Sequence, residues 1–424
     1  MPKTDEIPNL EAIRARMQAV HESGDNLKLS WRRKQLRTLQ RLLQAAYDDL
    51  LDALYEDLGK ERVESAACEL ALVTAEINMA LASVARWMRP EKVGAPAVLM
   101  PSFHRIEKRP LLGPAILIIG PFNYPVNLTL LPAVGALAAG NPVVIKPSEL
   151  TPKTSAVLAR AVAEHFDPSV MCVVGGGPPV STALLQLSWG KIFFTGSERV
   201  GKIVARAAAE TLTPVVLELG GKSPVIVDET APADLQIVAN RITWSKLLNG
   251  GQTCCAPDYL LVHESKVDKL LELAVRSIQV QFGNDPAKSE LGRMVTPGHA
   301  QRLKGMITEV ESNKETRMIL GSASNCAPSE CYVCPTIVQN PPLTARLWKE
   351  EIFGPILPVR TFKTRKEAID MVRSLPGNPL ALYVFTCQEK VLQEYTAKIR
   401  SGAVFRNDVS MLRASGASDC MAWQ

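Results

Sequence analysis

The sequence predicts an α/β protein whose core is a parallel sheet covered by helices on both faces. Two observations lead to this prediction: short apolar segments alternate with helical segments between residues 115 and 220, and residues 111–145 carry no charge at all. Parallel strands are buried on both faces and therefore appear as continuous hydrophobic runs. Glycine and proline interrupt the uncharged segment, so a buried strand followed by a buried helix explains it better than a membrane span.

Strands and helices are expected to alternate along the first half of the chain. The expected strands are 115–120, 142–147, 170–175, 191–196 and 214–220, and the expected helices between them are 126–140, 151–166, 179–188 and 199–210. Upstream, leucines at spacings of three, four and seven predict one long amphipathic helix over residues 30–58, and residues 64–88 predict a second. Polar–apolar alternation over 98–110 indicates an exposed strand or hairpin, and a second set of strands and helices begins at 221.

Length and composition indicate a globular protein of two or three domains. The 424 residues are 46% hydrophobic and 21% charged, and the net charge of +5 is spread over 48 basic and 43 acidic residues. The basic run at 31–37 lies in a helical pattern, so a solvated helix face explains it and nucleic-acid binding is not expected. The N-terminus lacks the apolar region of a signal peptide, and no membrane anchor is expected in this chain.

Cysteine usage indicates reduced thiols and a cytoplasmic location. The chain has nine cysteines, an odd number, and no secretory signal. Cys326 lies close to the segment CYVC at 331–334, which hints at a metal site. No histidine lies near this segment, and a fourth cysteine at zinc-site spacing is missing, so no metal is expected there.

The segment NGGQTCCAPDY at 249–259 places two adjacent cysteines behind glycine and small polar residues. A thiolate attacks carbonyl carbons well. The flexible NGGQT stretch would let backbone N–H groups face a substrate. The alternative is that Cys254 and Cys255 are both small core residues, and the pair alone does not decide between these two interpretations.

Two further polar residues supply what a cysteine nucleophile needs. Attack on an aldehyde creates an oxyanion, which needs a neutral donor such as a side-chain amide. Asn123 lies in GPFNYP directly after a buried strand, at the sheet edge where ligands bind, although a simple turn residue would fit the same position. A thioester must then be hydrolysed by an activated water. Glu218 in LELGG, at a strand end, is costly to bury unless it is paired or acts as that base.

Two loops are candidates for binding a dinucleotide. In FFTGSERVG a strand leads through a glycine loop into a helix, so Gly196 and Ser197 could meet a pyrophosphate at the helix N-terminus. The pattern is not GxGxxG and is a weak fingerprint. The rival loop GGGPP at 175–179 lacks N–H donors at its prolines, and a turn suits it better. In IKPSE, Lys146 could serve phosphate or ribose and Glu149 could accept two ribose hydroxyls, which would disfavour a 2′-phosphate.

Together these segments resemble the aldehyde dehydrogenase superfamily, and within it the class 3 group that includes the fatty aldehyde dehydrogenases. The matching segments are GPFNYPVNL, GNPVVIKPSEL, FFTGSERVGK, LELGGKSP, NGGQTCCAPDY and EEIFGPILPV. They occur in the family's order and cover about residues 30–409. Each segment is modest evidence alone, but six in the same order make the resemblance very specific.

The resemblance implies a role for each matching residue. Cys254 would be the nucleophile, Asn123 and the backbone N–H of Cys254 would form the oxyanion hole, and Glu218 would be the general base. Lys146 and Glu149 would hold the adenosine ribose. The remaining cofactor contacts would come from Gly196, Ser197, Glu198, Arg199, Val200 and Gly201 at the pyrophosphate, and from Glu351 and Phe353 at the nicotinamide ribose and ring.

The implied reaction is oxidation of an aldehyde to its acid through a cysteine thiohemiacetal and a thioester, with NAD as cofactor, NADP as an alternative and no metal. Apolar residues around the site loops suit a medium- or long-chain aliphatic, or an aromatic, aldehyde. Two other functions stay open: a catalytically impaired protein that binds cofactor without turnover, and a cysteine esterase that needs no cofactor. Cys255 matches no chemical position and is interpreted as a packed neighbour of Cys254, with a redox partner as the alternative.

The resemblance also implies the domain organisation. A Rossmann-type NAD(P)-binding domain would comprise 1–97 and 111–221, a catalytic domain 222–400, and an oligomerisation arm 98–110 with 401–424, which would support a homodimer. After residue 409 the family would continue into a Pro-Phe-Gly-Gly segment, whereas this chain continues with SMLRASGASDCMAWQ. We therefore expect a shortened C-terminus that lacks part of the substrate wall and of the dimer edge.

Overall fold

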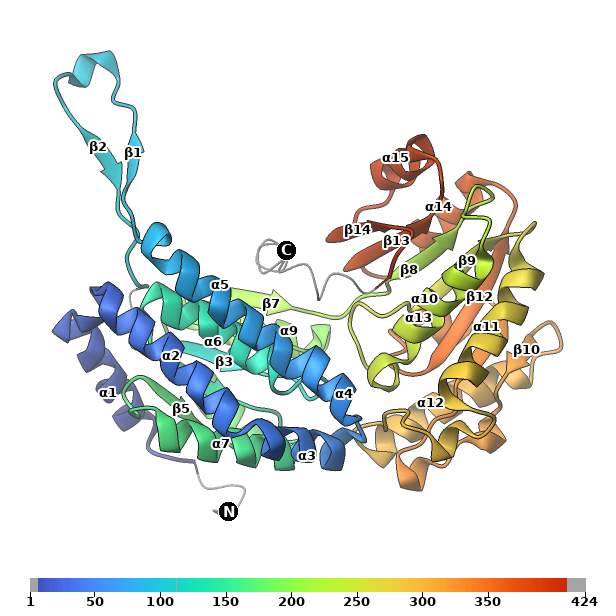
Figure 1. Cartoon of the computed structure of the whole chain (residues 1–424), viewed down its shortest axis with the longest axis horizontal. Helices are drawn as coiled ribbons and strands as arrows, with labels where there is room; N and C mark the ends of the chain where they lie inside the picture. Colours follow the sequence, from blue (N-terminus) through green and yellow to red (C-terminus); the bar gives the residue numbers. More distant parts are fainter. Residues whose placement is uncertain (1–6, 112, 410–424) are drawn as a thin grey trace. The chain divides into compact units, whose positions relative to one another are not determined.

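The computed structural model describes residues 7–111 and 113–409, which form two compact units (Figure 1). The first unit comprises the described residues up to 53 together with 65–218, and the second comprises 54–64 and the described residues from 219 onward. Residues 54–64 thus belong to the second unit, whereas the sequence placed all of 1–97 in the cofactor domain. The first unit ends at Glu218, three residues before the expected boundary.

The described part of the first unit is built around a five-stranded parallel sheet with the order β5-β4-β3-β6-β7. Its strands are β3 (Ile116–Ile119), β4 (Val143–Lys146), β5 (Met171–Val173), β6 (Lys191–Thr195) and β7 (Val215–Glu218), and the connecting helices are α6 (Asn127–Ala139), α7 (Pro152–His165), α8 (Pro178–Leu185) and α9 (Glu198–Glu210). β3 and β4 are buried along their whole length, as their continuous apolar runs predict. The strands and helices expected in this half are confirmed, with ends shifted by a few residues.

The strand order of this sheet reverses at β3. From β3 the chain adds β4 and β5 on one side, then crosses to the other side of β3 to add β6 and β7. All neighbouring strands are parallel, so their carboxyl ends meet at one edge of the sheet. In register, Lys146 at the end of β4 and Phe194 of β6 both pair with Ile119 of β3. Open α/β sheets bind ligands outside this edge, at the point of reversal.

The long helix expected over 30–58 is broken into two. After α1 (Leu10–Ser23), α2 (Leu29–Ala45) ends at Ala46, and α3 (Tyr47–Leu58) follows directly. The six leucines of the apolar stripe are all buried: Leu36, Leu39, Leu43, Leu50, Leu54 and Leu58. The predicted apolar face of the helix is therefore confirmed, whereas the prediction of one continuous helix is wrong. The first four of these leucines belong to the first unit and the last two to the second.

The helix expected over 64–88 is confirmed as α4 (Arg62–Ser65), a π-helical turn (Ala66–Leu70) and α5 (Ala71–Trp87). Among the described residues, Arg62–Trp87 is long and apolar enough to cross a membrane by length and composition alone. A core helix passes the same test, and α5 packs against α2 and α6.

A two-stranded hairpin extends from the first unit after α5 (Figure 1). β1 (Glu91–Val93) pairs antiparallel with β2 (His104–Ile106), and a short 3-10 turn (Ala97–Leu99) lies between them. The hairpin thus begins before the expected segment 98–110. Its large apolar side chains are exposed, with Val98 at 88% and Phe103 fully open to solvent.

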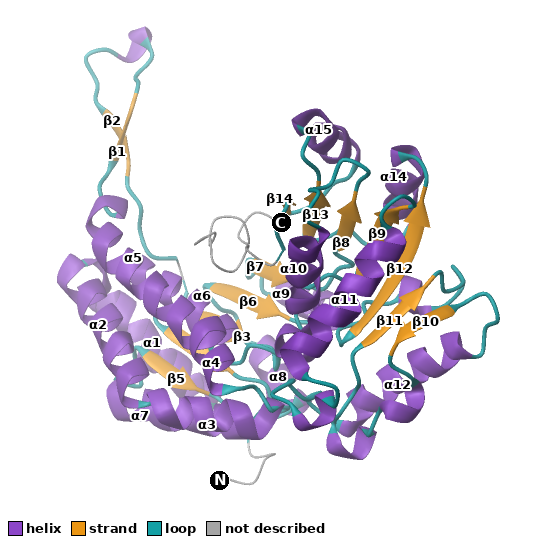
Figure 2. Cartoon of the chain, turned by 45° about the vertical axis from the view of Figure 1, so that its right-hand side comes forward, coloured by secondary structure: helices purple, strands orange, loops and turns teal. Residues whose placement is uncertain are grey.

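The described part of the second unit contains a seven-stranded sheet with the order β10-β11-β12-β9-β8-β13-β14 (Figure 2). β10 is antiparallel to β11, and the other pairs are parallel. The strands are β8 (Pro224–Val227), β9 (Tyr259–His263), β10 (Arg317–Leu320), β11 (Thr336–Gln339), β12 (Ile356–Phe362), β13 (Ala381–Phe385) and β14 (Ala403–Arg406), and the main helices are α10 (Leu235–Leu247), α11 (Val267–Phe282), α12 (Pro297–Glu311), α13 (Arg346–Lys349), α14 (Arg365–Ser374) and α15 (Glu389–Lys398).

The chain just after residue 400 joins this sheet and not the arm. Ala403–Arg406 pairs in parallel with β13, so backbone hydrogen bonding ties it to the second unit. Residues 403–406, which the sequence assigned to the oligomerisation arm with the rest of 401–424, therefore belong to the sheet of the second unit, and the expected arm is corrected accordingly. Residues 410–424, which hold the segment SMLRASGASDCMAWQ, lie outside the described residues.

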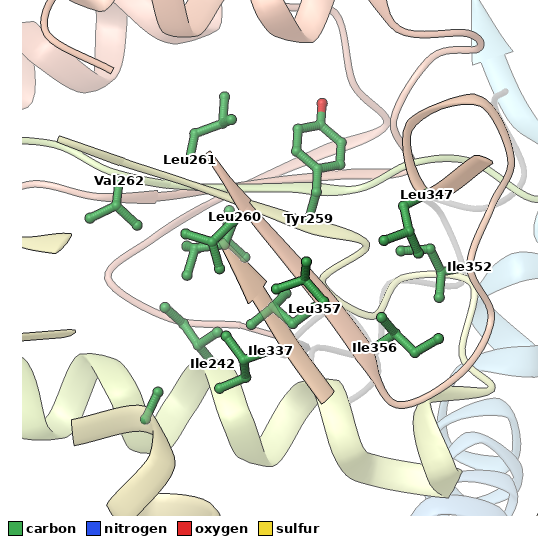
Figure 3. Close-up of a cluster of buried hydrophobic side chains, with 14 of the residues drawn as sticks. Ile242, Tyr259, Leu260, Leu261, Val262, Ile337, Leu347, Ile352, Ile356 and Leu357 are labelled. Carbon is green, nitrogen blue, oxygen red and sulfur yellow. The ribbon is translucent and has the colours of Figure 1, made fainter. Parts of the chain in front are cut away.

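The hydrophobic core of the second unit is centred on β9 and its neighbours (Figure 3). The labelled side chains come from β9, β11, β12, α10, α13 and the segment before β12: Tyr259, Leu260, Leu261, Val262, Ile337, Ile356, Leu357, Ile242, Leu347 and Ile352. Each is almost completely buried. The central strand is apolar at every position before His263, as expected for a parallel strand covered on both faces.

Asp228 joins three elements at the end of β8. Its buried carboxylate accepts hydrogen bonds from Arg365 Nε (3.0 Å) on α14, the Tyr395 hydroxyl (3.0 Å) on α15 and the Thr230 hydroxyl (2.7 Å). Burial by itself would raise the pKa of Asp228, but these hydrogen bonds outweigh it and hold the pKa below its usual range.

We expect Asp228→Asn to lower the free energy of unfolding by about 3 kcal/mol at pH 7, because Arg365 loses its buried partner. The pKa is lowered in the folded state, so the carboxylate's contribution is complete above about pH 4 and is lost as pH falls through the folded value. Urea unfolding should therefore show a difference that shrinks in acid. The control Asp370→Asn, which removes an exposed ion pair with Lys366 on α14, should change little. Equal losses for both variants would contradict this account.

Candidate active site

Four predicted site residues lie at the carboxyl edge of the first unit's sheet. Lys146 ends β4, Glu218 ends β7, and Asn123 lies in the loop between β3 and α6. Gly196 directly follows β6, and its N–H donates to the Glu218 carbonyl (2.9 Å). Parallel pairing therefore collects an amide, an ammonium group and a carboxylate at the edge where such sheets bind ligands.

The loop that carries Asn123 is held by a buried carboxylate that no motif identifies. Glu69, in the π-helical turn, accepts hydrogen bonds from the backbone N–H groups of Val126 (3.2 Å) and Asn127 (2.8 Å) at the start of α6. A negative charge at a helix N-terminus is also favoured by the helix dipole. The available signal was an isolated acid in an apolar helical stretch, since the following residues LALV carry no charge.

Glu218 has the properties of a proton acceptor. It is 9% exposed, and its Oε1 is buried without a hydrogen-bond partner among the described residues. Burial raises the pKa of Glu218 to about 7. A buried carboxyl group that the fold leaves unsatisfied is unusual, and a pKa near neutrality is what a general base requires.

The residues that follow β4 and β6 at the carboxyl edge of this sheet fit a dinucleotide. Lys146 Nζ lies 2.6 Å from Glu149 Oε2; the lysine side chain is buried, whereas Glu149 is 42% exposed and open to a ligand. α9 begins after Ser197, whose hydroxyl accepts from Val200 N–H (3.4 Å). A Cβ at Gly196 would lie 2.7 Å from the Phe194 ring, so glycine is needed there. A helix N-terminus suits a pyrophosphate, and an exposed carboxylate suits a ribose.

The first turn of α9 holds the remaining predicted pyrophosphate residues. Glu198, Arg199 and Val200 open the helix, and Gly201 is buried in it. The charge of Glu198 is offset by Lys202 one turn later, at 2.5 Å. The positive end of the helix therefore keeps its attraction for an anion.

In the second unit, three consecutive residues before the cysteines have left-handed backbone. They are Asn249 (φ 55°), Gly250 (φ 61°) and Gly251 (φ 77°), residue types that tolerate this conformation. A Cβ at Gly251 would lie 2.4 Å from the carbonyl group of Gly354, and one at Gly250 would lie 2.9 Å from Met294. NGGQT is thus a closely packed turn, which corrects the flexible stretch expected from its composition.

Gln252 joins this turn to the loop at residues 293–295 of the second unit. Its Nε2 donates to the carbonyls of Asn249 (3.0 Å) and Arg293 (2.9 Å), and its Oε1 accepts from Val295 N–H (3.0 Å). The side chain is 1% exposed, so these bonds replace water that the amide has lost. The backbone leading to Cys254 is therefore held on both sides.

The two cysteines have different surroundings. Cys254 is partly exposed, whereas Cys255 is 3% exposed and belongs to the hydrophobic core of the second unit. The Cys255 carbonyl accepts a hydrogen bond from the Tyr383 hydroxyl (2.6 Å), which anchors the backbone next to Cys254. The interpretation of Cys255 as a packed neighbour is confirmed, and neither cysteine forms a disulfide with a described residue.

Glu351 and Phe353 lie together in the segment that leads into β12. The Glu351 carboxylate accepts a hydrogen bond from Gly221 N–H, and a Cβ at Gly220 would lie 2.1 Å from its Oε2. Burial raises the pKa of Glu351 to about 8, with Asp258 adding to the rise. Its Oε1 is buried without a hydrogen-bond partner in the described residues. A ribose hydroxyl would satisfy that atom, so this residue also fits a bound dinucleotide.

The cysteine-rich segment has no set of metal ligands in the described part of the chain. The Sγ atoms of Cys326 and Cys334 lie 3.5 Å apart, and both residues are buried. Within the described residues, no group of three or more His, Cys, Asp or Glu side chains could hold a metal ion.

A family model described as the aldehyde dehydrogenase family matches residues 5–418. The chain belongs to the aldehyde dehydrogenase family. The enzyme is therefore an oxidoreductase that oxidises an aldehyde, and the alternative of a catalytically impaired protein is not favoured.

Curated relatives and a solved structure place the enzyme within the class 3 group. It is 40% identical over 384 residues to the 4,4'-diaponeurosporen-aldehyde dehydrogenase of Staphylococcus aureus, covering 90% of this chain and 81% of that one. It is 39% identical to human aldehyde dehydrogenase family 3 member B1, covering 94% and 82%. A structure titled the substrate-bound state of Staphylococcus aureus AldH superposes with a TM-score of 0.90 at 37% identity, covering 96% and 86%.

We expect Gly251→Ala to destabilise the enzyme by more than the roughly 1–2 kcal/mol that a left-handed alanine costs, because its Cβ would meet the Gly354 carbonyl. The same change should slow alkylation of Cys254 by iodoacetamide. Gly377→Ala is a matched control, since Gly377 has φ 78° but no atom within 4 Å of the added Cβ. If thermal unfolding and alkylation respond equally in the two variants, close packing at Gly251 is not what holds the turn.

Proposed function

We propose that this enzyme oxidises medium- or long-chain aliphatic, or aromatic, aldehydes to carboxylic acids through a thioester on Cys254. Glu218 carries the thioester part of the proposal. Its carboxyl group is buried, its Oε1 has no hydrogen-bond partner among the described residues, and its pKa is about 7, so it is suited to take a proton from water when the thioester is hydrolysed. The apolar residues that the sequence places around the site loops support the substrate class, as do the class 3 relatives, one of which is named for 4,4'-diaponeurosporen-aldehyde.

Each residue has a defined part in the proposed reaction. Cys254 Sγ bonds to the aldehyde carbon, and the amide of Asn123 and the Cys254 N–H donate hydrogen bonds to the resulting oxyanion. A bound nicotinamide supplies the acceptor for the hydride that leaves this carbon. Glu218 then removes a proton from the water that cleaves the carbon–sulfur bond, which returns the thiol and yields the acid.

The cofactor site favours NAD and leaves NADP as an alternative. Lys146, Glu149 and the α9 N-terminus at Gly196–Gly201 would hold the adenosine ribose and the pyrophosphate. Glu351 and Phe353 would hold the nicotinamide ribose and ring. The exposed Glu149 carboxylate would repel a 2′-phosphate, although its ion pair with Lys146 reduces that repulsion.

We expect a distinct kinetic signature for each catalytic variant. Cys254→Ala should form no NADH from decanal or benzaldehyde. Glu218→Gln should give about one equivalent of NADH in a burst and then turn over at least about 100-fold more slowly, because the thioester accumulates. In the unaltered enzyme, deacylation should accelerate as pH rises through about 7, since the raised pKa keeps Glu218 protonated below that value.

Rapid-mixing measurements of NADH absorbance between pH 5.5 and 8.5 would test these expectations. Ester cleavage by Cys254 without any NADH from aldehydes would instead support the esterase. Cofactor binding with neither activity would support a protein without turnover.

We further propose a homodimer in the cytoplasm. The hairpin β1–β2 supports the dimer, since it presents Val98, Met100 and Phe103 to solvent at exposures that monomeric proteins avoid. The cysteines of the described residues, none of which forms a disulfide, support the location.

We expect Phe103→Asp to shift the enzyme from dimer to monomer, because a buried charge at the subunit contact would be unpaired. Size-exclusion chromatography with light scattering measures this directly. Tyr55→Ser removes another exposed aromatic residue outside the hairpin and should leave the mass unchanged. A monomeric unaltered enzyme would contradict the proposal.

A further inference from the structure

A buried lysine is bound to backbone carbonyls in and directly after the short helix α13 in the second unit. Lys222 Nζ donates to the Asp258 carboxylate and to the carbonyls of Leu347 (2.9 Å) and Glu350 (2.7 Å). These three bonds use all three ammonium protons. The side chains of Lys222 and Asp258 are only 4% and 5% exposed, so neither charge is screened by water.

Asp258 and Arg302 hold the next residues of the same segment. Asp258 Oδ1 accepts from Ile352 N–H (2.9 Å), and Arg302 Nη2, on α12, donates to the Ile352 carbonyl (2.6 Å). Both backbone groups of Ile352 are therefore bound by buried or half-buried charges. Hydrogen bonds to charged groups are stronger than those between neutral groups.

These contacts fix the backbone dihedral angles of Glu351. The peptide plane before Glu351 contains the Glu350 carbonyl, which Lys222 holds, and the plane after it contains Ile352 N–H, which Asp258 holds. Because φ and ψ describe the rotation of these two planes, neither angle is free. The following plane, held by Arg302, leads to Phe353, whose φ of 53° is unfavourable for a bulky residue and persists only where neighbours impose it.

Side-chain burial supports the same segment. Leu347 and Ile352 lie close together in the core, next to Ile356 at the start of β12 (Figure 3). Each is fully buried. Apolar packing alone would stabilise this segment, and a buried ion pair usually adds little to stability. The hydrogen bonds made by the charged side chains therefore serve mainly to set the orientation of the peptide groups beside Glu351.

We propose that Lys222, Asp258 and Arg302 are positioning residues that orient Glu351 and Phe353 toward the nicotinamide half of the cofactor. This inference rests on the proposed role of Glu351 and Phe353 in binding that half. Asp258 also follows Cys254 by only four residues and donates its own N–H to the Ser223 carbonyl (2.8 Å). One carboxylate thus connects the nucleophile loop to the cofactor segment within the second unit.

Arg302→Met is the primary test, because Arg302 is 31% exposed and methionine fills a similar volume. We expect NAD to bind at least about 5-fold more weakly by titration calorimetry, and NADH formation in the burst to slow about 10- to 100-fold, as expected for a misplaced reacting group. Cofactor-free hydrolysis of p-nitrophenyl acetate by Cys254 should stay within about 2-fold of the unaltered enzyme. Arg302→Lys, which can still donate to the Ile352 carbonyl, should recover part of the loss.

Two further variants separate positioning from general packing. Arg346→Met, on α13, removes a surface ion pair with Glu309 on α12 and keeps the backbone bond from Glu350 N–H to the carbonyl of residue 346, so it should change none of these values. In the double variant Arg302→Met/Glu351→Gln, the effects on NAD binding should not add, because Arg302 acts through Glu351.

Additive effects, or a parallel loss of ester hydrolysis and hydride transfer, would overturn the positioning role. The same conclusion would follow if Glu351→Gln alone left NAD binding unchanged. In each of these cases aldehyde oxidation that depends on Cys254 would still stand. By contrast, an unaltered enzyme that binds NAD but forms no NADH from aldehydes would contradict the proposed function, while the effect of Arg302→Met on NAD binding would remain measurable.

Discussion

The parallel pairing of β3 with β4 on one side and β6 on the other is the constraint on which the first unit depends. Parallel strands need a crossover helix between them, and every strand then ends at the same edge. That geometry alone places Asn123, Lys146, Gly196 and Glu218 near one another, although up to about a hundred residues separate them in the sequence. The N–H of Gly196 even donates a hydrogen bond to the backbone carbonyl of Glu218.

The sequence predicted correctly those elements that depend on interactions between residues close together in the chain. Continuous apolar strands, the N-cap at Ser197 and the burial of the six leucines all follow from patterns within a few residues. It failed where distant segments decide the outcome. The apolar stripe gives no sign of the break at Ala46. β14 joins a sheet because it pairs with β13, some twenty residues earlier in the chain. The sequence also could not predict the close packing of NGGQT, because this packing depends on Gly354 and Arg293, which are distant in the chain.

Buried polar groups in this protein fall into two classes. Glu69, Asp228, Lys222 and Asp258 are costly to bury and are bonded to backbone or to partners, so their desolvation is offset. Glu218 and Glu351 each keep one buried oxygen without a partner in the described residues, and burial raises the pKa of both. In the sequence, only isolated acids and bases in apolar surroundings pointed to the first class. The second class coincides with residues that the family motifs had already singled out.

The left-handed run from Asn249 to Gly251 also limits how this enzyme can evolve. Three successive residues adopt the mirror-image handedness of an ordinary helix, and side chains of natural chirality are excluded at Gly251 by contact with Gly354. A side chain at Gly251 would require the backbone of Gly354 to shift. Diversification toward new aldehydes must therefore come from residues outside this turn, while the turn itself stays as an inherited, nearly immutable backbone shape that presents the thiol.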